Sequence, residues 1–294
     1  MWERTPPFTW RNIVIDIIKT VGIVGQGFVG KALRDVFSKY YVTNTYDKFF
    51  SELSTHSCIS ELCKDCDVVF VCVPTPMKKG GAYDTSIVES VCDEAVAAGG
   101  DHLIVLKSTI TPGTTKSLNE KLDTKQIVFN PEFLTERFAS KDFENTNRVM
   151  LGGDIAATTT LKQFYSHVFP NVTVVKTDSC TAEYVKYLSN CFLAVKVAVA
   201  NEFAIMCEAS GVDYDKVTEY ATFDPRLGNT HWVVPGPDGK RGFGGSCFPK
   251  DINSIIDFAT NMGVPCYTLL GAWTTNLTVR PEKDWEQLKG RAVV

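Results

Sequence analysis

Residues 242 to 251 read GFGGSCFPKD and place one cysteine between a glycine-rich turn and the start of a predicted helix. Glycines lack the Cβ atoms that would keep another molecule away from the backbone. Pro249 suits the first turn of a helix, because its missing N–H has no intrahelical partner there. Cys247 would then lie at the positive end of the helix dipole, which favours the nucleophilic thiolate. The stretch therefore predicts a reactive cysteine or, alternatively, a small buried cysteine in a tight turn.

Two pairs of polar residues recur at a spacing of four. Lys186 and Asn190 stand among apolar residues of a long predicted helix, which puts both on one face. Glu132 and Glu136 would share a face in the same way if a helix starts after Pro131. Lysines on helices are usually solvated, but a lysine among apolar neighbours could polarise an oxygen or move a proton. Both pairs are therefore candidates for catalysis, with solvated side chains as the alternative.

A glycine-rich turn near the amino terminus predicts a dinucleotide site. Gly25, Gly27 and Gly30 follow a predicted strand and open a helix with the spacing G-x-G-x-x-G. This spacing allows a tight turn and lets a pyrophosphate approach the helix N-terminus. Asp47 ends the next strand, where a carboxylate would accept the ribose hydroxyls and repel a 2′-phosphate. We therefore expect NAD as the cofactor, with the adjacent Lys48 solvated.

Composition limits the partners and the location. The chain has 294 residues, 44% hydrophobic and 22% charged, which suits a globular chain of two domains. A net charge of −4 argues against nucleic acid as the main partner. The apolar run at residues 12–25 is interrupted by Asp16 and Lys19, so no membrane partner is expected. The amino terminus lacks the basic-then-apolar order of a signal peptide, which favours a cytoplasmic protein.

The ten cysteines mostly lie in apolar segments, as reduced and buried thiols do. Cys58, Cys63 and Cys66 have the spacing with which one iron–sulfur pattern begins. Their surroundings predict a helix end, a turn and a buried strand, which would aim the thiols apart. We therefore expect no metal.

The first half of the chain alternates strands and helices, which predicts an α/β fold: a Rossmann-like, doubly wound parallel sheet. Strands are predicted at residues 20–25, 41–47, 67–74, 102–108, 126–130 and 148–153. Helices are predicted to begin near Phe28, Thr85 and Thr114.

From about residue 178 to 211 the chain has no proline and no internal glycine, which predicts one long central helix. An all-helical domain follows, so we expect a NAD-binding domain at 1–177 and a helical dimerisation and substrate domain at 178–294. Residues 224–247 form a long loop rich in glycine and proline, and loops of that size are usually functional. The apolar content of the long helix predicts a homodimer.

The motifs of this chain, taken together, resemble those of the UDP-glucose/GDP-mannose dehydrogenase family. The matching segments cover roughly residues 20 to 275 in the family's order. They are GIVGQGFVG, VPTP with the later Asp84, KSTITPGTT, NPEFLTE, EYVKYLSNCFLAVKVAVANE, DPRLG and GFGGSCFPKD. The last is the most specific, since related single-step hydroxyacid dehydrogenases share the lysine–asparagine helix but lack the cysteine.

The resemblance implies an NAD-dependent four-electron oxidation of UDP-glucose to UDP-glucuronate, with a thiohemiacetal and a thioester on Cys247. Alternatives are oxidation of GDP-mannose or another sugar nucleotide, a single-step hydroxyacid dehydrogenase, or a non-catalytic nucleotide-binding subunit. By the same resemblance, Lys186 would stabilise the oxyanion with Asn190 and a water. Asp251 would orient that water or act as a base. The resemblance also implies Glu132 or Glu136 in thioester hydrolysis and Thr109 in holding a water.

The resemblance extends to the residues that would contact the two ligands. The implied cofactor contacts are Gly25, Gln26, Gly27, Phe28, Val29, Gly30, Asp47, Lys48, Pro74, Thr75, Pro76, Ser108 and Thr109. The implied substrate contacts are Phe133, Leu134, Lys186, Asn190, Arg226, Phe243, Gly244 and Gly245, with Lys240 and Arg241 added on charge alone. By the same resemblance, Arg226 corresponds to an arginine that reaches across the dimer interface of family members to the nucleotide of the partner.

Two features depart from the family pattern. Family members usually continue into a third, Rossmann-like domain that helps bind the uridine, and we expect a short form or a fragment without most of it. The segment WVVPGPDGKR is longer than the corresponding loop of many members and is expected to take over nucleotide contacts. The nucleotide base, the sugar and the pathway stay open.

Overall fold

The computed structural model describes residues 18–294, which form two compact units. Unit 1 comprises residues 18–73, 89–108 and 113–182, and unit 2 comprises residues 74–88, 109–112 and 183–294. The units interleave along the chain, and the domain limits 1–177 and 178–294 stay a prediction. The residues on which the expectation of no signal peptide rests lie outside the described part.

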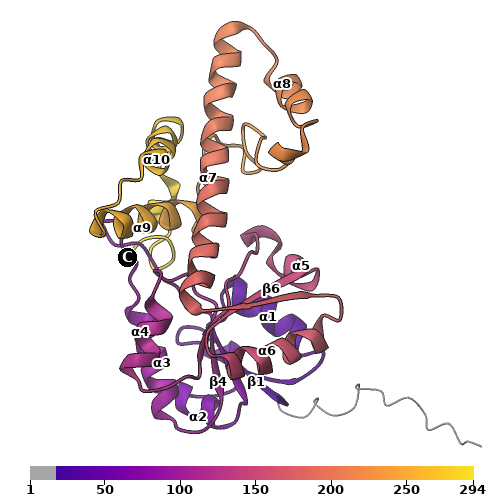
Figure 1. Cartoon of the computed structure of the whole chain (residues 1–294), viewed down its shortest axis with the longest axis vertical. Coiled ribbons are helices and arrows are strands. Elements are labelled where there is room, and N and C mark those ends of the chain that lie inside the picture. Colours follow the sequence, from indigo (N-terminus) through magenta and orange to yellow (C-terminus); the bar gives the residue numbers. More distant parts are fainter. Residues whose placement is uncertain (1–17) are drawn as a thin grey trace, which may run out of the picture. The chain divides into compact units, whose positions relative to one another are not determined.

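Unit 1 is built on a seven-stranded sheet with the order β2-β1-β3-β4-β5-β6-β7 (Figure 1). The strands are β1 (Thr20–Val24), β2 (Val42–Tyr46), β3 (Val68–Val71), β4 (Leu103–Leu106), β5 (Ile127–Phe129), β6 (Arg148–Gly152) and β7 (Thr173–Thr177). Every residue of β3 and β5 is buried. Continuous apolar runs of this kind are required of strands that are covered on both faces of a sheet. The α/β, Rossmann-like fold expected from the sequence is confirmed.

The sheet is mainly parallel rather than wholly parallel. Strands β1 to β5 pair in parallel, but β6 is antiparallel to β5, to which it is joined by the pair Phe129↔Gly152. Strand β7 then runs parallel to β6. The sequence predicted a doubly wound parallel sheet and did not indicate this one antiparallel pairing; mixed sheets of this kind are common among doubly wound folds.

Helices cover both faces of the sheet (Figure 1). One set is α1 (Phe28–Phe37), α5 (Ala139–Glu144) and α6 (Ile155–Val168), and the other is α2 (Ile59–Lys64), α3 (Ser86–Ala97) and α4 (Thr114–Lys121). Short 3₁₀ turns lie at Ser51–Leu53 and Glu136–Phe138. Phe37 of α1 centres the first core, with its ring 5.1 Å from that of Phe70 and 5.0 Å from that of Phe164. The predicted helix starts at Phe28, Thr85 and Thr114 agree with α1, α3 and α4 to within one residue.

Unit 2 contains most of the long helix α7 (Ser179–Ser210) and a helical region after it. The further elements are α8 (Tyr214–Ala221), a 3₁₀ turn (Pro225–Leu227), α9 (Phe248–Asn261), α10 (Tyr267–Val279) and a last 3₁₀ turn (Asp284–Gln287). Its apolar core joins Tyr187 and Ala194 of α7 to Phe243, Ile252 and Ala272. The predicted loop before α9 is present, with no helix or strand between the 3₁₀ turn and Phe248.

Helix α7 is long and apolar enough to cross a membrane by length and composition, with a mean hydropathy of 1.5 over its most apolar window. The expectation of no membrane partner rested on residues 12–25 alone, and α7 is a longer apolar candidate than that run. A core helix of a globular protein passes the same test, and α7 buries 44% of that window. It also buries the charged side chains of Glu183 and Lys186, which fits a helix packed into protein.

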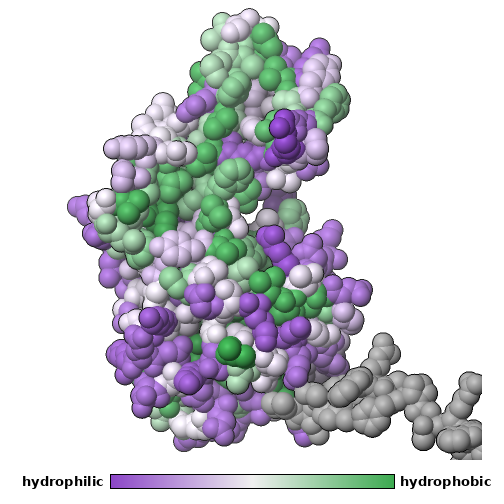
Figure 2. Space-filling view, viewed as in Figure 1, coloured by the Kyte–Doolittle hydropathy of each residue, from purple (hydrophilic) through white to green (hydrophobic). Residues whose placement is uncertain are grey.

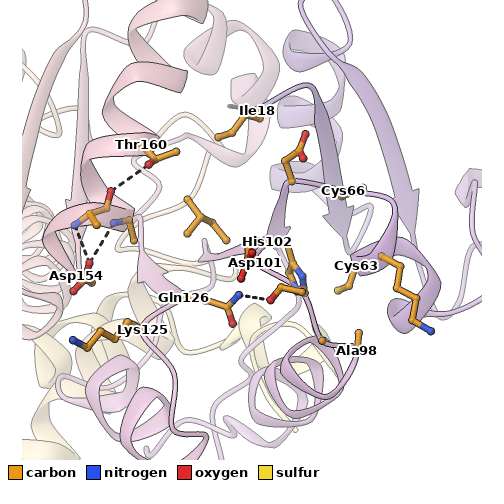
Figure 3. A pocket seen from close by; sticks show the side chains of 17 residues that line it. Ile18, Cys63, Cys66, Ala98, Asp101, His102, Lys125, Gln126, Asp154 and Thr160 are labelled. Atoms are coloured by element: carbon orange, nitrogen blue, oxygen red, sulfur yellow. Dashed lines mark hydrogen bonds between the residues drawn. The ribbon is translucent and has the colours of Figure 1, made fainter. Parts of the chain in front are cut away.

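A cavity of about 790 Å³ lies at the edge of unit 1 where the strands begin (Figure 3). It is lined by Asp67, Asp101, His102 and Gln126, among others. His102 is buried, which lowers the pKa of its imidazole, and its Nε2 has no hydrogen-bond partner among the described residues. None of the site residues predicted from the sequence lines this cavity.

Asp67 ties the start of β1 to the start of β3 and generates a stability prediction. Its Oδ2 accepts hydrogen bonds from the N–H groups of Lys19 and Thr20 and from the Thr20 hydroxyl, at 2.8, 2.9 and 2.8 Å. Burial works to raise the pKa of this carboxyl, but these bonds outweigh it and hold the pKa below its ordinary value. A lowered folded-state pKa means that the stabilisation is present at neutral pH and is lost as the pH falls through that value.

We predict that Asp67→Asn lowers the free energy of unfolding by about 1–3 kcal/mol at pH 7, because three donors lose a charged acceptor. Urea denaturation at pH 7 and at pH 3 measures it, and the difference between variant and wild type should shrink at pH 3. Asp101→Asn, at an exposed position of the same sheet edge, is the control and should change the stability by less than about 0.5 kcal/mol. Equal effects of the two substitutions would contradict the prediction.

Candidate active site

The three glycines of the turn between β1 and α1 have different roles in the structure. Gly25 has φ +91°, and a Cβ there would lie 2.7 Å from the Cys72 carbonyl oxygen. A Cβ on Gly30 would overlap the Gly25 carbonyl oxygen, so Gly30 lets α1 pack against the turn. A Cβ on Gly27 would meet nothing within 4 Å. The open space beside Gly27, at the N-terminus of a ten-residue helix, fits an approaching pyrophosphate.

Asp47 joins this turn to the end of β2. Its Oδ2 accepts a hydrogen bond from the Gln26 N–H at 2.7 Å, and its Oδ1 accepts from the N–H groups of Phe49 and Phe50 at 2.8 and 3.1 Å. These bonds hold the carboxylate beside the turn. Oδ1 already accepts two hydrogen bonds, and Oδ2 keeps capacity for one more donor. That arrangement fits a ribose hydroxyl. The neighbouring Lys48 is exposed.

The remaining predicted cofactor residues fall into both units. Phe28 and Val29 are part-buried in the first turn of α1. Ser108 is buried in unit 1 and donates to the Val73 carbonyl at 2.6 Å. Pro74, Thr75 and Pro76 belong to unit 2 with Thr109, and the Thr75 hydroxyl donates to the Thr109 carbonyl at 2.8 Å. Their contact with NAD stays a prediction.

A buried carboxylate gathers three of the predicted catalytic residues within unit 2. Asp251, in the first turn of α9, is 1% exposed. Its Oδ2 accepts a hydrogen bond from Asn190 Nδ2 at 2.6 Å, and its Oδ1 accepts from Lys250 Nζ at 2.6 Å. Lys186, one turn before Asn190 on α7, is also buried and acts on the same carboxylate through its charge. The structure therefore brings Lys186, Asn190 and Asp251 together.

The charge state of Asp251 follows from this surrounding. Burial alone would raise the pKa of its carboxyl. The positive charges of Lys250 and Lys186 and the hydrogen bonds from Lys250 and Tyr83 outweigh burial, and the pKa lies below its ordinary value. Asp251 is therefore a carboxylate at neutral pH. Its role in orienting a water or acting as a base stays a prediction.

Cys247 is the N-cap residue of α9 and lies one helical turn before Asp251. Its carbonyl accepts the first hydrogen bond of the helix, from the Asp251 N–H at 2.9 Å. The Ser246 hydroxyl lies 3.9 Å from its sulfur. The side chain is part-buried. At this place the helix dipole favours negative charge, as expected from the Gly–Cys–Pro pattern.

The chain's own side chains fill the space beside two glycines of the GFGG segment. A Cβ on Gly242 would overlap Asn276 Oδ1, and one on Gly244 would overlap the guanidinium of Arg280. The Cβ side of both glycines is therefore filled by the chain itself, and their contact with a sugar nucleotide stays a prediction. Gly245 has φ +71° and nothing within 4 Å of a Cβ, so it alone of the three keeps open space.

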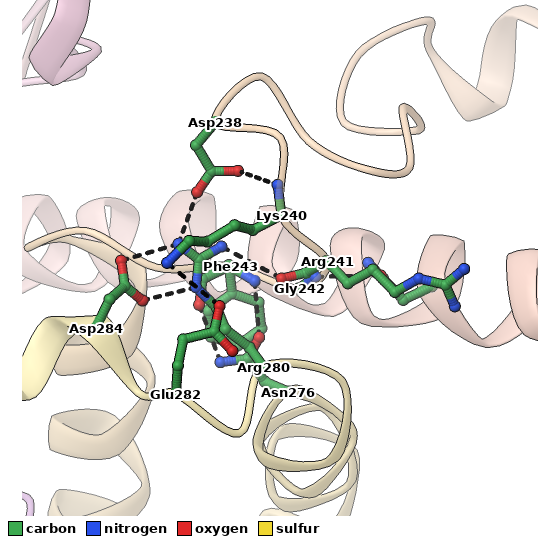
Figure 4. A network of polar contacts seen from close by, with 10 residues as sticks. Asp238, Lys240, Arg241, Gly242, Phe243, Asn276, Arg280, Glu282 and Asp284 are labelled. Atoms are coloured by element: carbon green, nitrogen blue, oxygen red, sulfur yellow. Dashed lines mark hydrogen bonds and ion pairs between the residues drawn. The ribbon is translucent and has the colours of Figure 1, made fainter.

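Asn276 and Arg280 hold the loop before Cys247 (Figure 4). Asn276 Oδ1 accepts from the Phe243 N–H at 2.7 Å, and its Nδ2 donates to the Phe243 carbonyl at 3.0 Å. Arg280 is 2% exposed and donates to Asp238 at 2.6 Å and to Asp284 at 2.7 and 2.9 Å. Burial opposes the charge of Arg280, but the two carboxylates outweigh it and raise the pKa of the guanidinium. Both residues were missed in the sequence, because neither belongs to a motif and their partners Phe243 and Asp238 are distant in the chain.

The cations predicted to bind the diphosphate are already paired. Lys240 Nζ lies 3.3 Å from a carboxylate oxygen of Glu282, and Arg241 is paired with Glu208. Arg226 forms an ion pair with Asp224 and remains exposed. A phosphate would have to compete with these carboxylates, so contacts from Lys240, Arg241 and Arg226 stay a prediction.

No helix starts directly after Pro131, so the condition under which Glu132 and Glu136 would share a helix face is not met. The backbone of residues 131–135 is irregular, and a 3₁₀ turn begins at Glu136. The Glu132 carboxylate accepts the Leu134 N–H at 2.7 Å, a local bond that competes with helix formation. Glu132 is buried and Glu136 is exposed, so the two do not share a helix face.

A smaller cavity of about 310 Å³ in unit 1 is lined by Glu132, Phe133 and Leu134 together with Lys107 and Asn130. Lys107 Nζ donates to Asn130 Oδ1 at 3.0 Å, and both residues are buried. The cavity brings the predicted hydrolytic Glu132 beside polar groups that could orient a water. Among residues 18–294, no group of three or more histidine, cysteine or acidic side chains could hold a metal.

Comparison with known proteins identifies the relatives of this chain. Residues 41–169 match the model for the NAD binding domain of the UDP-glucose/GDP-mannose dehydrogenase family, and residues 180–277 match the model for its central domain. A UDP-glucose 6-dehydrogenase of Rickettsia bellii is 38% identical over 226 residues, which cover 71% of this chain and 51% of the relative. One of Caenorhabditis elegans is 32% identical, over 68% of this chain and 45% of the relative. The chain spans about half the length of the curated relatives it matches.

Solved structures agree with the fold. A UDP-glucose dehydrogenase of Pyrobaculum islandicum superposes with a TM-score of 0.79 at 27% identity, covering 92% of this chain and 71% of that one. A 3-hydroxyisobutyrate dehydrogenase of Mycobacterium tuberculosis superposes with a TM-score of 0.72 at 18% identity, over 90% of this chain and 95% of that one. The second likeness shows the fold alone. The match to the NAD binding domain confirms NAD as the cofactor.

The different roles of Gly27 and Gly30 can be separated by substitution. We predict that Gly27→Ala keeps the melting temperature within about 2 °C of wild type but weakens NAD binding at least tenfold, because the new methyl group occupies the space left for the pyrophosphate. Gly30→Ala should instead lower the free energy of unfolding by about 1–3 kcal/mol, because its methyl group overlaps the Gly25 carbonyl. Thermal denaturation and calorimetric titration with NAD measure the two effects. Unchanged NAD affinity in Gly27→Ala would contradict this assignment.

Proposed function

The chain belongs to the UDP-glucose/GDP-mannose dehydrogenase family, and from this premise we propose that it oxidises UDP-glucose to UDP-glucuronate with two NAD⁺ in turn. The single observation that carries the proposal is the placement of Cys247 one turn before Asp251, which joins Asn190 and the charge of Lys186. A single-step dehydrogenase has no use for a cysteine at this place.

In the first oxidation, C6 of the glucose loses a hydride and its hydroxyl loses a proton, which gives an aldehyde. NAD⁺ supplies the hydride acceptor in this step and in the second oxidation. Lys186 donates a hydrogen bond to the developing oxyanion, and the Asp251 carboxylate orients the water that receives the proton. A buried cation beside a developing negative charge stabilises it more strongly than it would in water.

The Cys247 sulfur then adds to the aldehyde, and the thiol proton goes to the new oxygen to form a thiohemiacetal. The second oxidation removes a hydride from C6 and a proton from that oxygen, which leaves a thioester. The N-terminus of α9 assists by favouring the thiolate. Water finally cleaves the thioester to the carboxylate and regenerates the thiol, with Glu132 proposed as the base because it is buried among polar groups. Glu136 is the alternative base.

The residues present fit NAD. The open space at Gly27 and the Asp47 carboxylate beside it match the pyrophosphate and the ribose, with Gln26 and Gly30 shaping the turn. Thr109 is proposed to hold a water near C6. UDP-glucose is favoured over GDP-mannose and other sugar nucleotides because the curated relatives named above act on it by name. A cytoplasmic location is part of the proposal.

We also propose that two copies of the chain pair along α7. Tyr184, Leu188 and Phe192 form a stripe on this helix at a spacing of four and are 43%, 70% and 64% exposed. Hydrophobic residues gather over α7 in Figure 2. Large apolar side chains aligned on one helix face indicate an interface, and a second copy offers the same face.

We predict that wild-type protein forms two NADH for each UDP-glucose and releases UDP-glucuronate. Cys247→Ser should lose at least about a thousandfold in turnover, because a serine hydroxyl without a dedicated base is a far weaker nucleophile. NADH absorbance and mass spectrometry of the product measure both. Cys247→Ala should still reduce supplied UDP-glucose aldehyde with NADH, which controls for folding and cofactor binding. One NADH per substrate, or near wild-type uronate formation by Cys247→Ala, would contradict the proposal and favour a single-step dehydrogenase.

For the dimer, light scattering should give twice the 32.5 kDa of one chain at micromolar concentration. Leu188→Arg should shift this mass to that of the monomer, because two charges would be buried against each other at the interface. Ile155→Arg, at an exposed apolar position outside α7, is the control and should leave the dimer intact. A monomeric wild-type protein would exclude the interface.

A further inference from the structure

Tyr83 is a buried tyrosine next to the Asp251 carboxylate, and the reaction proposed above gives it no role. It lies in the segment Pro74–Val88 of unit 2, with 5% of its surface exposed. Its hydroxyl donates a short hydrogen bond to Asp251 Oδ1, and its ring stacks on that of Tyr187 with the centroids 6.1 Å apart. The segment carries Thr75, one of the predicted cofactor residues, so Tyr83 joins that segment to α9.

Lys250 fixes the direction of the Tyr83 hydroxyl. Its Nζ donates to the Tyr83 oxygen at 3.1 Å and to Asp251 Oδ1 at 2.6 Å, and it lies 4.7 Å from the centre of the tyrosine ring. An ammonium group can only donate hydrogen bonds, so the tyrosine oxygen accepts from Lys250 and keeps its single proton for Asp251. The phenol is therefore aimed at the carboxylate.

The two oxygens of Asp251 are thereby assigned to different partners. Oδ1 is held by Tyr83 and Lys250, and Oδ2 is left for Asn190 of α7 at 2.6 Å. Without Tyr83, Lys250 alone would hold Oδ1, and the plane of the carboxylate would be freer to tilt away from Asn190. The hydroxyl thus restricts Asp251 to one orientation towards α7.

We propose that Tyr83 is a positioning residue for the oxidation: its hydroxyl holds Asp251 Oδ1 so that Oδ2 stays directed at Asn190 of α7. This inference rests on the proposed function. Tyr83 acts through Asp251 and does not touch the sugar or the sulfur in this role.

The pH dependence of the reaction should report this role. The titratable groups that face Asp251 are Lys250 on α9, Lys186, Tyr187 and Cys191 on α7, and Tyr83. Burial raises the pKa of Tyr83, Tyr187 and Cys191 well above neutral pH, so these three are uncharged donors. The Tyr83 hydroxyl stabilises the charged form of Asp251 and lowers its pKa. Loss of the hydroxyl therefore raises the pKa of Asp251. When the pH is lowered, the variant protonates Asp251 at a higher pH than wild type does, and activity that needs the carboxylate is lost there.

The test is the pH profile of kcat for Tyr83→Phe with UDP-glucose and NAD. Phenylalanine keeps the stacked ring and removes only the hydroxyl. The acid limb should move up by about one pH unit, as expected for one hydrogen bond to a charged group, while KM for UDP-glucose stays within about twofold of wild type. Tyr214→Phe is the control: it removes a hydroxyl that donates to the Trp232 carbonyl at 2.7 Å, and its acid limb should match wild type.

A second measurement does not depend on turnover. Carboxyl carbon NMR of protein labelled at aspartate, with the Asp251 signal assigned by Asp251→Asn, should show Asp251 of wild type titrating below the ordinary aspartate value and about one unit higher in Tyr83→Phe. An ordinary or raised value in wild type, or equal values in both proteins, overturns the role of Tyr83. If wild type does not oxidise UDP-glucose, the proposed function fails, and the NMR titration still decides whether Tyr83 holds Asp251.

Discussion

The pairing of the buried Asp251 carboxylate is the interaction on which the arrangement of unit 2 depends. A charge removed from water persists only when opposite charges and hydrogen bonds replace its hydration. At Asp251 the replacements come from Lys250 of the same helix, from Asn190 of α7 and from Tyr83 of the segment 74–88. Three segments far apart in the sequence must therefore keep one relative position, because a shift of any of them leaves charge without a partner.

The glycines show how one residue type serves two purposes in one chain. At Gly30, Gly242 and Gly244 a Cβ would overlap atoms of the protein itself, and at Gly27 and Gly245 it would enter open space. Only the second group has open space on the side where a Cβ would lie. A glycine-rich motif thus indicates close approach to the backbone, but the approaching atoms can belong to the same chain.

The sequence predicted the elements whose pattern is local. Strands β1, β3, β4 and β5 are apolar runs bounded by turns, and α7 is an uninterrupted helical segment, so their existence could be read directly. Strand β7 escaped notice because none of its five residues is buried and three of them are polar, which makes its pattern weak. The direction of β6, the partners of Arg280 and the position of Tyr83 depend on contacts between residues distant in the sequence. The irregular backbone after Pro131 includes a local hydrogen bond from the Leu134 N–H to the Glu132 carboxylate, which no periodicity reveals.

The contact of Arg280 with Gly244 also restricts how the two positions can change during evolution. The guanidinium occupies the volume where any side chain at position 244 would begin, and it is held there by Asp238 and Asp284. A larger residue at 244 becomes acceptable only in a background where 280 is already short, and a short residue at 280 leaves both aspartates without their cation. Positions 238, 244, 280 and 284 therefore form one group that must be exchanged together. Transfer of the GFGG loop between relatives should carry all four.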